Sequence, residues 1–444
     1  MMRAYSSKGP KKGRQSRLRG LAGVLLAMVI VLSACSGADN NAGSRSTEGA
    51  SNAASAEKGN SGNAPREALG ESDRSPTSSE PKKEIVERNG VYTNPKQKIQ
   101  AGQLTAGEWD DLAAWEGFNN LLNSQEGDSS KRFWGFWQFH RLEVIVSANG
   151  RAVSDAEVVL QADNQAVWQA RTNTDGIAYV YAGLYEQRAL KTSNAYNVQV
   201  SFGQEQKTTQ GLDITRQGSV KVDLGSGVPG TEPSEKVDLM FVVDTTGSMK
   251  DELDYLEAEL KDVVERVADE HANQLGIRVS ANFYRDAGDE YITRPYPFTT
   301  NINEVIDQFS EQNARGGGDY PEAVDQALRD GIHKHDWSEE ARARLLFLVL
   351  DAPPHEDAQV IEEVHRLIED ASEKGIRIIP VASSGVNADT EYLLRFMAVA
   401  TGGTYLFLTD DSGIGGDHLE PAVGEYEVKL LNDLLVEVIN RYVS

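Results

Sequence analysis

The C-terminal half of the chain alternates between two kinds of segment, and this alternation constrains the fold most strongly. Short apolar runs, among them VDLMFVVD at 237–244 and ARLLFLVLD at 343–351, are separated by stretches with apolar residues at helical spacing. In the first such stretch Met249, Leu253 and Leu256 begin one apolar face. Buried strands alternating with amphipathic helices form sheets that are covered on both sides. We therefore expect residues 236–444 to form an α/β domain with a doubly wound, mostly parallel sheet.

Residues 140–225 show a pattern with a period of two. Segments such as RLEVIVSANG, AEVVLQA and YNVQVSFG alternate apolar and polar residues and are separated by Gly, Asn and Asp turns. About seven short strands in this range predict an antiparallel β-sandwich. The stretch ARTNTDGIAYVYAGL resembles the transthyretin-like modules of carboxypeptidase regulatory regions. We expect a spacer or binding module here, joined to the α/β domain by a Gly/Pro/Ser linker at 226–235.

Residues 91–139 are predicted to form a helical and aromatic connecting segment. Thr105 is expected to cap a helix whose apolar positions include Trp109, Leu112 and Trp115. The following string FWGFWQFH is rich in aromatic side chains. Two interpretations are open: an exposed recognition patch, or a plug that packs this segment onto the next domain. We favour the plug.

The N-terminus carries the features of a secretion signal. Residues 1–20 contain Lys and Arg but no acidic residue, and the apolar run LAGVLLAMVIVL follows them. Twelve apolar residues are too few to span a bilayer comfortably. Ser33 and Ala34 before Cys35 resemble the lipobox of bacterial lipoproteins. That resemblance implies that residues 1–34 are cleaved off and that Cys35 carries lipid; an uncleaved anchor is the alternative.

The expected anchor determines where the rest of the chain would be. The lipobox resemblance implies a membrane-attached protein on the outer face of the cell membrane or, in a diderm, at the outer membrane. Cys35 is the only cysteine, so no intramolecular disulfide is possible. Residues 35–90 are dominated by Ser, Gly, Asn, Ala and Glu and show no apolar period, which predicts a disordered tether.

The charge balance excludes one class of partner. The chain has 44 Lys and Arg residues against 68 Asp and Glu residues, a net charge of -24. Nucleic acid is not expected as a partner, because binding phosphates requires a basic surface. The acidity is explained either by solubility or by attraction of cations and basic partners.

Polar residues follow two of the expected buried strands directly. Asp244, Thr246 and Ser248 come at the end of the first strand of the α/β domain, and Asp351 ends the strand LLFLVL. Ligands of open α/β sheets bind at the carboxyl ends of the strands. We therefore expect these four side chains to meet at one edge of the sheet.

A glycine-rich loop, RGGGDYPEAV, is expected to add a third carboxylate. It contains Asp319, and Pro321 is predicted to begin the next helix. Three carboxylates and two hydroxyls, with no His or Cys, are hard oxygen ligands. This set suits Mg²⁺, Mn²⁺ or Ca²⁺ better than Zn²⁺, and we expect Mg²⁺.

These motifs resemble the von Willebrand factor type A domain and its metal-ion-dependent adhesion site. The family's Asp-x-Ser-x-Ser motif stands here as DTTGS, with Thr246 in place of the first serine, and its separate aspartate matches Asp351. The family's threonine falls in GGGDYP, where Asp319 is the nearest oxygen ligand. The motifs are most similar to bacterial and kinase-associated type A domains. The resemblance implies that a protein partner offers a Glu or Asp carboxylate to the bound cation. The departure at Asp319 adds a negative charge, which is expected to tighten cation binding and to weaken the attraction of an acidic partner.

Other interpretations of the same residues are open. Asp244 and Ser248 would also be explained if they only capped the following helix. Ser248 follows a strand and precedes a helix as a hydrolase nucleophile does, but Gly-x-Ser-x-Gly is absent. A structural envelope protein with a stabilising cation is a further alternative. We expect no enzymatic activity, and we expect Arg285 and Asp286 to form a local ion pair.

Overall fold

The structure is a computed structural model that describes residues 99–187, 195–226, 228, 232–272 and 274–444. The expected signal segment, Cys35 and the tether at 35–90 lie outside these residues. In the part of the chain that the structure describes, no helix is long and apolar enough to cross a membrane.

An eight-stranded sheet forms the centre of the C-terminal half, in the order β12-β11-β10-β13-β14-β15-β1-β16. Its five middle strands are parallel: β11 (Gly276–Tyr284), β10 (Lys236–Asp244), β13 (Ala343–Leu350), β14 (Ile376–Ala382) and β15 (Tyr405–Leu408). Every residue of β13 and β14 is buried, which is the burial expected of strands covered on both faces. The expectation of an α/β fold is confirmed.

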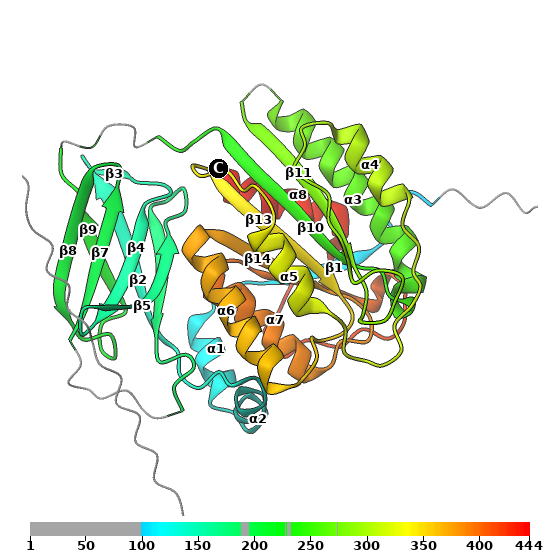
Figure 1. The fold of residues 1–444 in the computed structure, drawn as a ribbon, viewed down its shortest axis with the longest axis horizontal. Coiled ribbons are helices and arrows are strands. Elements are labelled where there is room, and N and C mark those ends of the chain that lie inside the picture. Colours follow the sequence, from blue (N-terminus) through cyan, green and yellow to red (C-terminus); the bar gives the residue numbers. More distant parts are fainter. Residues whose placement is uncertain (1–98, 188–194, 227, 229–231, 273) are drawn as a thin grey trace, which may run out of the picture. The chain divides into compact units, whose positions relative to one another are not determined.

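Helices lie on both faces of this sheet (Figure 1). Leu239 and Phe241 of β10 pack in one core with α3 (Lys250–His271), α4 (Ile302–Ser310) and α8 (Leu431–Val443). Met240 and Val242 point to the other face and pack in a second core with α5 (Val324–His333), α6 (Ala358–Lys374) and α7 (Ala388–Thr401). The alternation of side chains along one strand therefore supplies both cores.

The strand β1 (Thr105–Trp109) corrects the expected helix at this position. It pairs antiparallel with β15, Ala106 opposite Leu408, and with β16 (Lys429–Leu430). The carboxylate of buried Glu259 accepts the backbone N–H groups of residues 102, 103 and 104 at 2.7, 2.8 and 3.0 Å. This clamp and the open side of β15 favour an extended backbone, so Thr105 caps no helix.

Two helices and an aromatic plug follow β1. The helices are α1 (Trp115–Leu122) and α2 (Gln125–Trp134). Trp134 and Phe136 are buried, and Phe136 stacks on Phe396 of α7 with ring centroids 3.4 Å apart. Most of the aromatic side chains thus pack as the plug interpretation expects, but their partner is α7 of the α/β half. Phe133, at 37% exposure, stays at the surface.

Residues 140–223 form two four-stranded sheets, here called the β-module. One sheet has the order β3-β2-β6, with β9 paired to β2, and the other has the order β5-β4-β7-β8. Alternate residues of β2, among them Leu142, Val144 and Val146, are fully buried. The strands are β2 (His140–Ala148), β3 (Arg151–Ala152), β4 (Glu157–Ala162), β5 (Gln165–Arg171), β6 (Ile177–Ala182), β7 (Tyr196–Phe202), β8 (Glu205–Leu212) and β9 (Ser219–Asp223).

The β-module is attached to the α/β half by specific polar contacts. Trp168 of β5 donates from Nε1 to Ser372 Oγ of α6 at 3.1 Å, and Ser372 Oγ donates to the carbonyl of Gln169 at 2.8 Å. Tyr181 of β6 donates its hydroxyl to the carbonyl of Val399 at 2.7 Å. These bonds join buried groups of the β-module to buried groups of α6 and α7, so the β-module packs on these two helices in one defined orientation.

Candidate functional site

The turn after β10 holds three of the expected side chains together. Asp244 is fully buried, and its Oδ1 accepts the backbone N–H of Thr246 at 2.8 Å and the Thr246 hydroxyl at 2.7 Å. Thr246 Oγ1 lies 3.1 Å from Ser248 Oγ. Gly247 lets the glycine-rich loop approach, since a Cβ there would lie 2.9 Å from the carbonyl of Gly316. The Asp244 carboxylate and the hydroxyls of Thr246 and Ser248 therefore lie side by side in this turn.

Helix capping does not explain these residues. A short 3-10 turn (Gly247–Met249) follows Thr246, and α3 begins only at Lys250. Neither element has a side-chain hydrogen bond to its N-terminal N–H groups. The carboxylate of Asp244 is directed to Thr246 instead, so the capping interpretation is wrong.

Asp351 reaches the same edge from the neighbouring strand. Val243 of β10 pairs with Val349 of β13, so both strands end at the same level. Asp351 is buried, and its pKa is raised chiefly by that burial, against a hydrogen bond from Ser248 that lowers it. Burial and then the charge of Asp351 raise the pKa of Asp244 as well. The two carboxylates repel one another.

The glycine-rich loop and the residues after it carry two acids, and the structure buries Glu322 rather than Asp319. Asp319 is exposed and forms no hydrogen bond or ion pair with any residue that the structure describes. Glu322 is 2% exposed instead. A Cβ at Gly317 would lie 2.8 Å from Glu322 Oε1 and 3.3 Å from Thr246 Cβ, so the Glu322 carboxyl lies on the Thr246 side of the loop. Burial, followed by the charge of Asp244, raises the pKa of Glu322 to about 9.

A contact with the segment after β13 fixes the position of Glu322, and because of it the helix α5 begins later in the sequence than expected. The backbone N–H of Glu322 donates to the carbonyl of Pro353 at 2.9 Å, and Glu322 forms an isolated β-bridge with Pro354. As a result α5 begins at Val324, and the expectation that Pro321 starts it is wrong. The sequence signal that could have indicated Glu322 is an acid between the glycine loop and the apolar start of α5.

Three carboxylate oxygens at this edge have no donor. Asp244 Oδ2, Asp351 Oδ1 and Glu322 Oε2 are buried, and none has a hydrogen bond of good geometry in the described part of the chain. The buried Tyr284 hydroxyl, itself without such a bond, lies near the Asp244 carboxyl and acts to lower its pKa. Leaving such an oxygen unsatisfied costs about 1–3 kcal/mol, and more when it is charged. No three His, Cys, Asp or Glu side chains among the described residues are close enough to form a ready metal-binding group. The set with two hydroxyls included, all hard oxygens, nevertheless fits a hard divalent cation.

The comparison with known families matches the region around this site. Residues 238–410 match the von Willebrand factor A domain. The chain contains a von Willebrand factor A domain. The matched range includes the whole turn after β10, the glycine-rich loop and Asp351. The strands β1 and β16 and helix α8 lie outside it, although they complete the same sheet and core.

One curated relative is similar to this chain over about half of its residues. A protein of Acanthamoeba polyphaga mimivirus, described as an ariadne-like RING finger protein, is 26% identical over 218 residues. The alignment includes 45% of this chain and 20% of the viral protein. The chain therefore spans about a fifth of the length of that relative.

A second group of polar residues, on α3 and in the loop after β15, lies next to the A-domain site. Glu252 on α3 is buried, and its charge acts to raise the pKa of Asp351. Glu252 lies 3.1 Å from Nε2 of His418, whose Nδ1 lies 2.8 Å from Asp410 Oδ1. Burial alone would lower the pKa of His418, but the carboxylates of Glu252 and Asp410 outweigh it and raise that pKa. The loop after β15 is thus attached to the helix that follows Ser248.

The expected Arg285–Asp286 ion pair does not form. Arg285 donates from Nε to the carbonyl of Thr245 at 3.2 Å and from Nη2 to the carbonyl of Asn313 at 2.8 Å. Asp286 lies 2.8 Å from Nε2 of His355 instead. Buried Arg285 is used to fix the backbone of the DTTGS turn, which local sequence does not reveal.

Proposed function

We propose that the A domain binds a protein partner through a divalent cation at the end of β10 and β13. Asp244, Thr246, Ser248 and Asp351 would hold the ion, with Mg²⁺ as the first choice and Mn²⁺ or Ca²⁺ as alternatives. Glu322 takes the place that the sequence suggested for Asp319. The proposal is carried by one observation: at the carboxyl end of β10 and β13, three buried carboxylate oxygens have no hydrogen-bond donor in the described part of the chain, and the hydroxyls of Thr246 and Ser248 lie in the same turn as Asp244.

The partner would be recognised at the rim of this site. A bound cation supplies positive charge that attracts a Glu or Asp carboxylate of the partner. Asp319 and Tyr320 are exposed on the glycine-rich loop, Tyr320 at 41%, and are available for contact. Glu322 is protonated in the cation-free site at neutral pH, since its pKa is raised to about 9. Once a bound cation has displaced that proton, the third carboxylate would leave a modest attraction for a single partner carboxylate.

Thermal unfolding of the chain with and without Mg²⁺ tests the cation site. A ligand at a hundred times its Kd stabilises the folded state by about 2.7 kcal/mol, so the Tm should rise by several degrees. Asp244→Ala should abolish this rise. Asp254→Ala removes the same charge from an exposed position on α3 and should retain it. An equal response in both variants would contradict the proposed ligands.

Partner capture separates adhesion from the two alternatives. Capture of a surface protein that is lost with EDTA and with Asp244→Ala supports cation-dependent adhesion. A Tm response to Mg²⁺ without any metal-dependent partner supports a purely structural cation. A hydrolytic activity that Ser248→Ala removes while Mg²⁺ still stabilises the protein would support a hydrolase.

We also propose that the N-terminal segment anchors the chain to the outer side of a membrane through lipid on Cys35. The helices on both faces of the parallel strands support a doubly wound sheet, and the two four-stranded sheets support a sandwich that serves as a spacer. Cys35→Ala should remove incorporation of labelled palmitate and move the protein to the soluble fraction. Unchanged labelling would contradict lipidation at Cys35.

A further inference from the structure

A cleft of about 530 Å³ lies where the β-module meets the A domain, beside the beginning of β10, whereas the DTTGS turn follows the end of that strand. Residues of β4, β5 and β7 line it from the β-module, and Ser234 and Glu340 line it from the A-domain side. Its size falls within the range of small-molecule sites, about 300–1,000 Å³.

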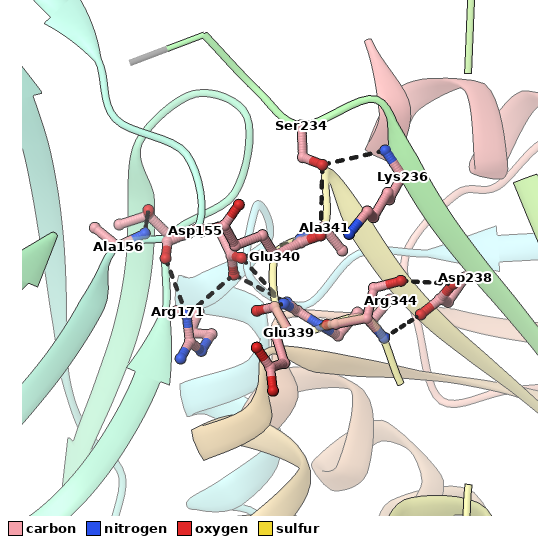
Figure 2. Close-up of polar contacts among 12 residues, drawn as sticks. Asp155, Ala156, Arg171, Ser234, Lys236, Asp238, Glu339, Glu340, Ala341 and Arg344 are labelled. Atoms are coloured by element: carbon pink, nitrogen blue, oxygen red, sulfur yellow. Dashed lines mark hydrogen bonds and ion pairs between the residues drawn. The ribbon is translucent and has the colours of Figure 1, made fainter. Parts of the chain in front are cut away.

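The wall of the cleft is held rigidly by Asp155. Its carboxylate binds the Arg344 guanidinium with two bonds of 2.9 and 3.0 Å and accepts the backbone N–H of Ala341 at 3.1 Å. Figure 2 shows Asp155 between Arg171 and Arg344, which belong to opposite sides of the interface. Asp155 has a φ of +59°, a left-handed conformation that is uncommon for a residue other than glycine. The contacts of its carboxylate stabilise this conformation, so the wall is fixed in shape.

Other polar groups of the cleft have no partner. The carboxylates of Glu157 and Glu340 line the cleft from its two sides, and neither forms a hydrogen bond or ion pair with any described residue. Ser154 also lines it, and its buried hydroxyl has no partner among those residues. Arg171, the one basic lining residue, shares the Asp155 carboxylate with Arg344, and the further lining acid Glu232 is paired with Arg151. The four acids Asp155, Glu157, Glu232 and Glu340 thus exceed these three arginines by one charge. The uncompensated charge of the cleft is therefore negative.

The cleft also contains an aromatic ring. Phe202, at the end of β7, lines it next to Gly203. A ring face together with carboxylates is the combination that binds ammonium and guanidinium groups, since the ring adds a cation–π attraction of about 0.5–1 kcal/mol at an exposed site. An anion would meet two unpaired carboxylates and is excluded by charge.

We propose that this interdomain cleft binds an organic cation, an amine or guanidinium group, between Glu157, Glu340 and Phe202. The cation is either a free small amine or a basic side chain of a peptide. The volume admits more than one amino group, so oligoamines and adjacent basic side chains are favoured over a single methylamine-sized cation. The site is independent of the cation site at the end of β10.

Isothermal titration of the full chain with two probes, cadaverine and a tri-lysine peptide, tests this site. We expect one saturable site per chain, with a Kd that the double variant Glu157→Gln/Glu340→Gln weakens about tenfold or more. Phe202→Leu should weaken it about two- to fivefold. Preference for cadaverine indicates a small-amine ligand, whereas preference for the peptide indicates a basic protein segment.

Matched variants distinguish the cleft from the general acidity of the chain. Glu116→Gln removes an exposed carboxylate on α1 and should leave the Kd unchanged. Asp244→Ala should also leave it unchanged, which separates this proposal from the proposed function. If neither probe binds, or if Glu116→Gln weakens binding as much as the double variant does, the proposal is overturned.

Discussion

Each end of the strand β10 carries a buried aspartate, and the two aspartates differ in the hydrogen-bond donors that their carboxylates receive. Asp238, at its beginning, is fully buried and receives Arg278 through two bonds of 2.8 and 2.9 Å and the backbone N–H of Ser338 at 2.6 Å. Asp244, at its end, is equally buried but faces Asp351 and has one oxygen without any donor within the described chain. The aspartate at the beginning of β10 therefore has hydrogen-bond donors for its carboxylate. The aspartate at the carboxyl end, where ligands of open α/β sheets bind, keeps one oxygen without a donor.

Other buried acids of the chain follow the pattern of Asp238. Asp111 is 3% exposed and binds Arg395 with two bonds of 2.7 and 2.8 Å. Glu259 receives three backbone N–H groups of the segment before β1. Against these, the carboxylates at the carboxyl end of β10 and β13 lack a basic partner, which supports their assignment to an external cation.

The largest expected effect concerns the satisfied end. Asp238→Ala leaves the Arg278 guanidinium and the N–H of Ser338 without their acceptor, and breaking such a pair typically costs about 3–5 kcal/mol. Urea unfolding should show this loss with an unchanged response to Mg²⁺. A decrease in the free energy of unfolding of less than about 1 kcal/mol would contradict the proposed difference between Asp238 and Asp244 at the two ends of β10.

The opposite effect is expected at the unsatisfied end. Without divalent cations, Asp244→Asn should raise the free energy of unfolding by about 1–2 kcal/mol, the equivalent of roughly one pKa unit, because it removes the repulsion with Asp351. The same variant should lose the stabilisation by Mg²⁺. Destabilisation in EDTA, measured by urea unfolding, would show that the carboxylates do not repel one another in the folded state.

The pH dependence of stability gives a third test. The pKa of Glu322 rises from 4.5 to about 9, so the folded state binds its proton more tightly than the unfolded state. The free energy of unfolding contributed by this group is therefore present below about pH 4.5 and is lost as pH rises toward about 9. Glu322→Gln should flatten the decline in EDTA. An unchanged pH profile would place Glu322 in a solvated position.

The smallest effect is expected at a surface pair that serves as a reference. Arg366 on α6 is 58% exposed at its side chain and pairs with Glu363 at 2.7 Å. Arg366→Ala should change the free energy of unfolding by less than about 1 kcal/mol, since exposed ion pairs contribute little. A change as large as that of Asp238→Ala would mean that burial does not explain the difference between these acids.

The sequence predicted which residues gather at the end of β10 where local sequence places them, and did not predict those that distant contacts place. Asp244, Thr246 and Ser248 share one turn, and Asp351 follows a strand that the apolar pattern identifies. Glu322 was missed because its position depends on the bridge to Pro354, and Asp319 was favoured because it stands nearest to the glycines. The backbone conformation of a loop is set by such partners, which no local pattern indicates.

The fold shows the same division. The strands of the A domain were visible as apolar runs, whereas β1 was interpreted as part of a helix. Its partner β15 lies about 300 residues further along the chain, and Glu259 on α3 holds the segment before it. Since both contacts are tertiary, they override the helical spacing of Trp109, Leu112 and Trp115.

Direct measurement of Mn²⁺ binding tests the central claim. Titration of the chain with Mn²⁺, followed by the electron paramagnetic resonance signal of the free ion, should show one bound ion per chain. Asp244→Asn should abolish this binding, and the exposed control Asp254→Asn should retain it. If the wild type leaves all Mn²⁺ free, or if both variants bind it equally, the unsatisfied carboxylates at the end of β10 do not form a cation site.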